Sequence, residues 1–119
     1  MKFDNNLPIY TQIVDYLKGK IVSGEIKEGD KLPSVRDIAK TLKVNPNTVQ
    51  RSYQVLELED IVASQRGKGS FVTEDKSKIK DLKTSMANKI VSNFIRDMED
   101  LGFNRNEIID IIKVQEEGK

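Results

Sequence analysis

The stretch from Val44 to Gln54 reads VNPNTVQRSYQ, and the interpretation of the whole chain starts from it. Asn45 is a residue type that caps helix N-termini, and Pro46 suits the first helical position, where a backbone N–H is not needed. These two residues predict a helix from residue 46 to about 59. On a helical wheel the helix has a packing side and a polar side: Val49, Ser52, Tyr53 and Leu56 face inward, Asn47, Gln50, Arg51 and Gln54 face outward, and Thr48 lies at the flank.

Two helices are predicted before this one. Apolar residues recur every four positions from Ile9 to Ile21, which predicts an amphipathic helix over residues 8–23 that ends at Gly24. Ser34 then caps a short helix. Its inward side chains are expected to be Val35, Ile38, Ala39 and Leu42.

A β-hairpin is predicted after the third helix, from segments 61–65 and 70–73 joined by the sequence RGKG at 66–69. Three helices followed by a hairpin is the element order of a winged helix-turn-helix. Beyond it, apolar residues step by three or four from Ile79 to Leu101 and predict a long helix. Asn104 and Glu107 resemble a capping box that opens a last helix.

The expected fold class is therefore mainly α with a small β-hairpin, in two parts. Residues 1–74 would form a winged helix-turn-helix domain, and residues 75–119 a short two-helix dimerisation tail. The apolar faces of such a tail are too broad for two helices to bury alone, so it would pack on the first helix, on a second copy, or on both. The residues expected to line that intersubunit or hairpin core are Phe94, Met98, Ile108, Ile111 and Ile112.

Composition excludes several functional classes. The chain has 119 residues with no Cys and no His, which removes disulfide scaffolds, thiol nucleophiles, the Ser-His-Asp triad and the commonest metal ligands. We therefore expect no enzyme activity, no cofactor and no metal. No apolar run approaches the length of a membrane span and no signal peptide precedes the first helix, so we expect a cytoplasmic protein without membrane contact.

The formal net charge is only +1, but the charges are unevenly distributed. Segments 33–54 and 64–70 hold six basic residues and one acid, Asp37, a local net charge of +5. A basic surface on a nearly neutral protein suits a polyanion. A solvated, lysine-rich surface without such a partner explains the charge alone about equally well.

The predicted arrangement suits double-stranded DNA. The helix that starts at Pro46 can enter a major groove, where Asn and Gln pair with adenine and Arg with guanine or phosphate. Arg36 can hold a phosphate, and the 66–69 tip can enter the minor groove. The candidate DNA-binding residues are Ser34, Arg36, Asn45, Asn47, Thr48, Gln50, Arg51, Arg66, Lys68 and Gly69.

Several of these residues also have a purely structural interpretation. Arg36 and Arg51 could form ion pairs within the chain, Arg36 near Asp37 and Arg51 with Glu57. Asn45 is a helix cap first and a DNA contact second.

Three segments in this order and spacing, LPSVRDIA (32–39), VNPNTVQRSY (44–53) and RGKGSFV (66–72), resemble the DNA-binding domain of the GntR family of bacterial transcription regulators. The opening LPIYTQI (7–13), the NPNTV turn and the short tail resemble its YtrA-like subfamily. The resemblance implies that Arg36 and Arg51 contact the operator, that the segment around Asn47 and Thr48 reads it, and that Gly69 reaches the minor groove. It also implies dimers through the C-terminal helices and control of a transporter operon that includes the protein's own gene.

The sequence departs from the family's pattern at three positions. Many relatives have arginines where this chain has Pro46 and Gln50, so some guanine contacts are expected to be absent here. Asp60 stands where the family usually has glycine. Because Asp tolerates left-handed backbone, we expect the turn to survive with some strain.

The function expected from these observations is a sequence-specific regulator, a repressor, that binds a palindromic operator as a homodimer; no effector ligand is indicated. The alternative is a winged-helix module that binds protein and not DNA, which the acid-free outer helix face argues against. An enzyme related to regulators fused to a pyridoxal-phosphate domain is set aside, since the chain has no length for that domain and no His or Cys.

Overall fold

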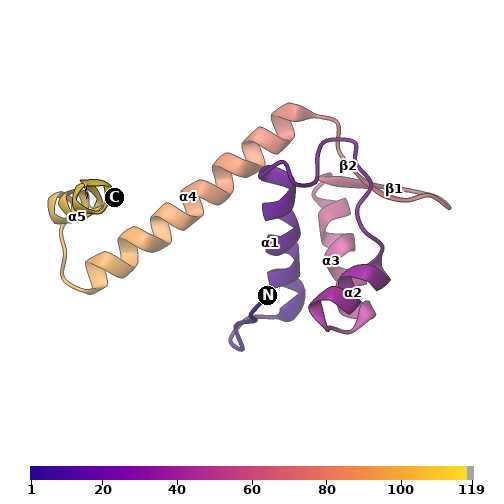
Figure 1. The fold of residues 1–119 in the computed structure, drawn as a ribbon, viewed down its shortest axis with the longest axis horizontal. Coiled ribbons are helices and arrows are strands. Elements are labelled where there is room, and N and C mark those ends of the chain that lie inside the picture. The colour runs from indigo at the N-terminus through magenta and orange to yellow at the C-terminus, as the bar shows by residue number, and fades with distance from the viewer. Residues whose placement is uncertain (118–119) are drawn as a thin grey trace. The chain divides into compact units, whose positions relative to one another are not determined.

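The computed structural model of the protein describes residues 1–117, which form five helices and one antiparallel hairpin (Figure 1). In chain order the elements are α1 (Ile9–Val22), α2 (Val35–Leu42), α3 (Pro46–Leu58), β1 (Val62–Gln65), β2 (Gly69–Val72), α4 (Lys76–Asp100) and α5 (Arg105–Glu117). The predicted class, mainly α with a small hairpin, is confirmed. By their internal contacts the residues divide into two compact units, residues 1–82 and the residues from Lys83 onward.

Side-chain caps start α2 and α3 where the sequence predicts. The Ser34 hydroxyl accepts a hydrogen bond from the Asp37 backbone N–H at 3.1 Å. The Asn45 side-chain oxygen accepts one from the Asn47 backbone N–H at 2.8 Å. Each cap satisfies one of the backbone donors that a helix N-terminus leaves unpaired.

Caps also begin α4 and α5. Asn104 and Glu107 form the predicted capping box, in which each side chain accepts a hydrogen bond from the other's backbone N–H, at 2.9 and 3.0 Å. Before α4, the Asp75 carboxylate accepts hydrogen bonds from the Ser77 hydroxyl at 2.6 Å and the Ser77 N–H at 3.0 Å. The hydrogen bond from the Ser77 hydroxyl is the main cause that lowers the pKa of Asp75, and the backbone N–H groups of Lys78 and Ser77 lower it further.

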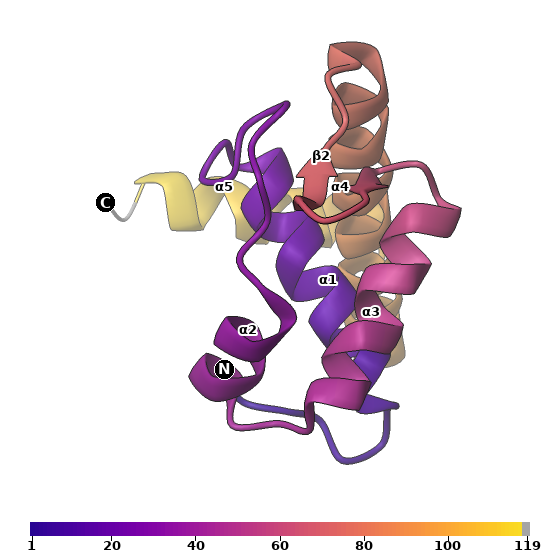
Figure 2. The ribbon, with the colours of Figure 1, turned by 90° about the vertical axis from the view of Figure 1, so that its right-hand side faces the viewer.

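The core of the first unit forms where α1 packs against the inner face of α3 (Figure 2). Four apolar side chains at its centre are completely buried: Ile13, Leu17, Val49 and Leu56. Ser52 is equally buried, and its hydroxyl lies 3.0 Å from the Tyr10 carbonyl oxygen and 3.1 Å from that of Thr48. A buried hydroxyl needs such partners, so Ser52 links α3 to the first turn of α1.

Two backbone turns in this unit use the left-handed region without glycine. Asp60, between α3 and β1, has φ 58°, as the sequence suggested. Lys43, between α2 and α3, has φ 57°. The expected break between the two helices at Lys43 and Val44 is present, and Lys43 is the residue that ends α2.

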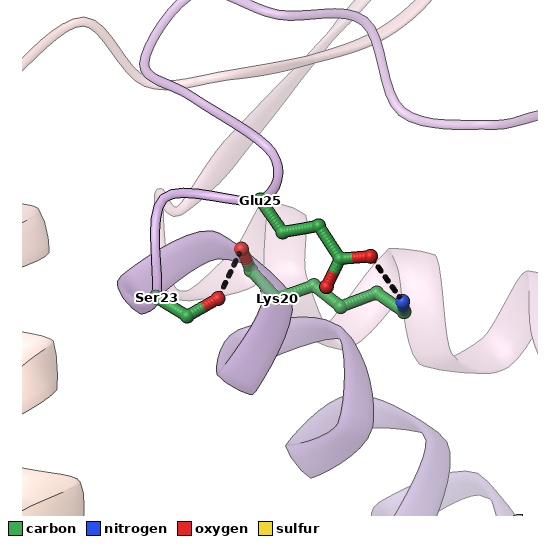
Figure 3. A network of polar contacts seen from close by, with 3 residues as sticks. All are labelled: Lys20, Ser23 and Glu25. Carbon is green, nitrogen blue, oxygen red and sulfur yellow. Dashed lines mark hydrogen bonds and ion pairs between the residues drawn. The ribbon is translucent and has the colours of Figure 1, made fainter.

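A contact network closes the C-terminal end of α1 (Figure 3). The Ser23 hydroxyl donates to the Lys20 carbonyl at 3.1 Å, and the Lys20 ammonium lies 3.0 Å from a Glu25 oxygen. Gly24, which lies between Ser23 and Glu25, turns the chain there in the left-handed region, with φ 86°. The hydrogen bond to Glu25 is the main cause that raises the pKa of Lys20, so this cation is already paired.

The hairpin carries a third segment that was not predicted. β1 pairs with β2 in antiparallel register from Val62 opposite Val72 to Gln65 opposite Gly69. Residues 30–32 lie along the other edge of β2: the Leu32 N–H donates to the Ser70 carbonyl, and the Val72 N–H to the Asp30 carbonyl, both at 2.8 Å. The hairpin β1–β2, which is the wing of this fold, is therefore hydrogen-bonded to the extended segment that precedes α2.

In the second unit the helices bury little apolar surface. Among residues 83–116, Ile108 is the one buried side chain, at 2% exposed. Met98 and Ile111 are half-buried, while Phe94 and Ile112 are exposed. The expected apolar faces are thus present, and most of them remain open to solvent within one chain.

Tyr53 ties α3 to the start of α2, because its buried hydroxyl donates a hydrogen bond to the Pro33 carbonyl. Burial, with a smaller contribution from the negative charge of Asp37, raises the pKa of Tyr53 to about 12.

The raised pKa of Tyr53 predicts a pH dependence of stability. The folded state holds the phenol proton more tightly than the unfolded chain, so the free energy of unfolding should fall as the pH rises from 10.0 toward about 12. Tyr53→Phe should remove this part of the fall and cost about 1 kcal/mol near neutral pH, through the lost hydrogen bond. Urea unfolding of both proteins across this range measures the difference. An identical pH dependence in the two proteins would show that Tyr53 is not responsible.

Candidate nucleic-acid interface

The outer face of α3 is exposed and polar, as the wheel predicts. Asn47, Gln50, Arg51 and Gln54 are exposed and Thr48 is half-buried, whereas the four predicted inner residues are buried. Because the inner face is held in the core, this set of side chains has a fixed orientation on a helix of 13 residues. No acidic residue interrupts it between Pro46 and Gln54.

Ser34 and Asn45 are first of all caps, with one side-chain oxygen of each occupied by a backbone N–H. The Ser34 hydroxyl hydrogen and the Asn45 amide hydrogens remain available as donors. Both residues are exposed at the N-terminal ends of α2 and α3. They can therefore serve as caps and still donate to a phosphate.

A groove of about 370 Å³ lies between the wing, α3 and the start of α2. It brings together four of the predicted residues: Ser34, Gln50, Lys68 and Gly69. Glu57 also lines it and contributes the one acid there. A polyanion would meet the basic wing side of this groove more favourably than the Glu57 side.

Lys31 is a basic residue of this groove that sequence reasoning missed. Its side chain passes over Gly69: a β-carbon at Gly69 would lie 2.7 Å from the Lys31 Cε. Gly69 has φ 110°, which L side chains rarely adopt. Glycine is thus required here by the backbone and by the neighbouring lysine. The sequence does show a lysine directly before Leu32-Pro33-Ser34. That Lys31 lies beside β2 depends on the strand pairing, which the sequence did not predict.

A second depression, of about 620 Å³, lies beside the N-terminal turn of α3. It brings Asn47, Thr48 and Arg51 together with residues 8–10 from the start of α1. The Arg51 guanidinium lies over the Tyr10 ring, with Cζ 3.8 Å from the ring centroid. Tyr10 is the second residue near the site that sequence reasoning missed.

The remaining predicted residues lie outside both depressions. Arg36 is exposed on the first turn of α2, and Arg66 is exposed at the tip of the wing. Among the side chains of residues 1–116 the ion pairs are Lys18 with Glu59 and Lys20 with Glu25. The ion pairs considered for Arg36 and Arg51 are therefore not formed in this structure, and both guanidinium groups remain available.

The described part of the chain carries neither a metal-binding cluster nor a membrane-spanning helix. The side chains of residues 1–116 include no group of acidic residues arranged to bind a metal ion. None of the helices described there combines the length and the hydropathy that crossing a membrane requires.

In this chain α2 and α3 are joined by a tight turn, α3 has an exposed polar face, and the hairpin β1–β2 follows as a wing. This arrangement defines the winged helix-turn-helix class of DNA-binding proteins. Residues 9–72 match the family described as bacterial regulatory proteins, gntR family. The chain belongs to the GntR family. It is a DNA-binding transcription regulator and not an enzyme, as the sequence predicted.

Similar proteins match the chain over nearly its whole length. It is 39% identical over 117 residues to a Bacillus subtilis protein described as uncharacterized HTH-type transcriptional regulator YhcF, covering 98% of this chain and 97% of that protein. It is 36% identical over 110 residues to the HTH-type transcriptional repressor YtrA of Bacillus subtilis, covering 92% and 85%. A solved structure of a GntR family transcriptional regulator from Listeria monocytogenes is 46% identical, with a TM-score of 0.86, and the match covers 93% of this chain and 97% of that one.

The geometry at Gly69 predicts that the two wing glycines differ in tolerance. Gly67 has φ 76°, and no atom lies within 4 Å of the position that an alanine methyl group would take, so Gly67→Ala should cost about 1 kcal/mol of stability. Gly69→Ala should cost more, roughly 2 kcal/mol, because φ 110° lies farther from the region open to alanine and Lys31 must move aside. Urea unfolding measures both values, and equal costs would contradict this account of Gly69.

Proposed function

We propose that the protein is a repressor that binds a palindromic operator as a homodimer. The observation that carries this proposal is the exposed outer face of α3, which is free of acids and lies beside a basic wing. The description of the relative YtrA as a transcriptional repressor supports the direction of regulation.

In this proposal α3 lies in the major groove of each half-site. Asn47 and Gln50 pair with adenine edges, Thr48 offers a hydroxyl and a methyl group, and Arg51 pairs with guanine or phosphate. Arg36, Ser34 and Asn45 contact the backbone and fix the register. The wing tip enters the neighbouring minor groove, where Gly69 permits close approach and Arg66, Lys68 and Lys31 add positive charge.

The proposed domain division is residues 1–74 for DNA binding and residues 75–119 for dimerisation. A second copy is the proposed cover for the apolar side chains that the tail leaves open, among them Ile90, Phe94, Leu101 and Ile112. A twofold dimer also matches the symmetry of a palindromic operator. In the proposed dimer this interface contains Phe94, Met98, Ile111 and Ile112, and Ile108 supports it from within the tail.

For targets, we propose a transporter operon together with the protein's own gene. This follows from the resemblance to the YtrA-like subfamily and sets the first DNA to be tested, the region upstream of the gene.

Substitutions should separate the residues that read bases from those that hold the backbone. Arg36→Ala should weaken binding to operator and scrambled duplexes alike, since a phosphate contact carries no sequence information. Asn47→Ala or Gln50→Ala should cost roughly 1–3 kcal/mol on the operator and little on scrambled DNA. Fluorescence anisotropy titrations with the two duplexes measure these losses. An unchanged sequence preference in both the Asn47 and Gln50 variants would refute this recognition face.

A salt series on the same duplexes is the control for the class of partner. Arg36, Arg51, Arg66 and Lys68 let a dimer neutralise on the order of 6–8 phosphates, so affinity should fall steeply with salt. A shallow slope would contradict DNA binding through this face and favour the protein-interaction alternative.

Ile112→Asp should separate dimerisation from folding. Ile112 is 50% exposed in the single chain, so a charge there leaves the fold of one chain intact, yet it would be buried in the dimer at a cost of several kcal/mol. We expect a monomer with nearly unchanged helical circular dichroism and with operator affinity lower by roughly 10²–10⁴-fold. Light scattering and anisotropy check both results.

Leu58→Asp is the matched control. Leu58 is also an exposed apolar residue, at 84%, but it lies at the end of α3 in the first unit. This variant should remain a dimer. A monomeric Ile112→Asp protein that binds the full operator tightly would overturn the dimer proposal.

A further inference from the structure

Arg51 is held against an aromatic ring in the free protein. Its Cζ lies 3.8 Å from the centroid of the Tyr10 ring. If the guanidinium pointed one N–H at the ring, the distance from Cζ to the ring centroid would be longer by about one C–N bond. The observed distance is therefore that of two planar groups stacked face to face. Stacking uses the face of the guanidinium and leaves the N–H donors on its edge free for a phosphate or a base.

Both partners of the stack stand on fixed backbone. Ser52, the residue after Arg51, is completely buried, and its hydroxyl lies 3.0 Å from the carbonyl oxygen of Tyr10 itself. Ile13 on α1 and Val49 on α3, which are each close to the stack in the sequence, are also completely buried. The core therefore fixes the separation of the two backbone positions that carry the stacked side chains.

The ring of Tyr10 has no comparable role in the core. Tyr10 is half-buried and does not belong to the hydrophobic cluster of the first unit, whereas Tyr16 packs against that cluster. Tyr10 instead lines the depression that contains Asn47, Thr48 and Arg51. Its ring thus lies at the edge of the surface proposed to read DNA.

We infer that Tyr10 is a positioning residue for the DNA contact of Arg51. This inference rests on the proposed function, in which Arg51 binds the operator. A free arginine side chain loses much conformational entropy when it is fixed on DNA. The Tyr10 ring restricts the guanidinium beforehand, so less entropy is lost on binding and the contact forms with its hydrogen-bond donors directed outward.

The other aromatic–cation contact of α1 provides a natural comparison. The Lys20 ammonium lies 5.0 Å from the Tyr16 ring centroid, but it is also paired with Glu25 at 3.0 Å. Tyr16 lies on the same helix as Tyr10, outside both depressions of the interface. Replacing it changes a tyrosine–cation contact without touching the proposed DNA surface.

The test uses full-length protein and two probes: a duplex enriched from a random library by the wild type, and a scrambled duplex of the same composition. Tyr10→Leu keeps apolar bulk and removes the ring. It should weaken binding to the enriched duplex by about two- to fivefold per subunit, the contribution of an exposed cation–π contact, and by about four- to twenty-five-fold for a dimer. Tyr10→Phe should bind like the wild type, and so should Tyr16→Leu.

A double-mutant cycle with Arg51→Ala separates positioning from a general structural effect. If Tyr10 acts through Arg51, Tyr10→Leu causes no further loss of affinity in the Arg51→Ala background. Three results would overturn the inference while leaving Arg51 as a DNA contact. The first is that Tyr10→Leu causes an equal loss of affinity in both backgrounds. The others are that Arg51→Ala binds more weakly while Tyr10→Leu binds like the wild type, or that Tyr10→Leu binds more tightly. A wild-type affinity of Arg51→Ala would overturn the proposed role of Arg51, and the inference with it.

Discussion

The packing of α1 against the inner face of α3 is the constraint on which the rest of the structure depends. Ile13 and Leu17 from α1 meet Val49 and Leu56 from α3 in a centre that solvent does not reach. Ser52 adds a buried hydroxyl that needs a hydrogen-bond acceptor, and it donates to the carbonyl oxygen of Tyr10. Rotation of α3 about its axis would break this arrangement, so the outer face has one orientation.

The other functional elements are attached to this centre by shared apolar packing and by hydrogen bonds. The hydroxyl of Tyr53 connects α3 to Pro33, just before the cap of α2. The backbone of residues 30–32 connects that same segment to β2, and thereby brings Lys31 against the wing. Helix α3, the start of α2 and the wing are thus held by one core, and their polar side chains gather at its rim.

The two units have opposite surface chemistry. In the first, most apolar side chains are packed in the core or against it, and the outer face of α3 from Asn47 to Gln54 is polar and carries the positive charge of Arg51. In the second, Ile108 is buried while Ile90, Leu101 and Val114 are each more than 60% exposed. A polar surface of fixed geometry suits a charged, structured partner such as DNA, and an open apolar surface suits a partner that covers it.

Local patterns in the sequence determined the helix starts and the two faces of α3. Caps such as Asn45 and the Asn104–Glu107 pair act within one turn of the helix, and the inward period of Val49 and Leu56 follows from helical geometry alone. The stack of Arg51 on Tyr10 and the place of Lys31 beside Gly69 were decided only by the tertiary structure. Each joins side chains from elements far apart in the sequence, and their approach is fixed by how the elements pack, which no local pattern encodes.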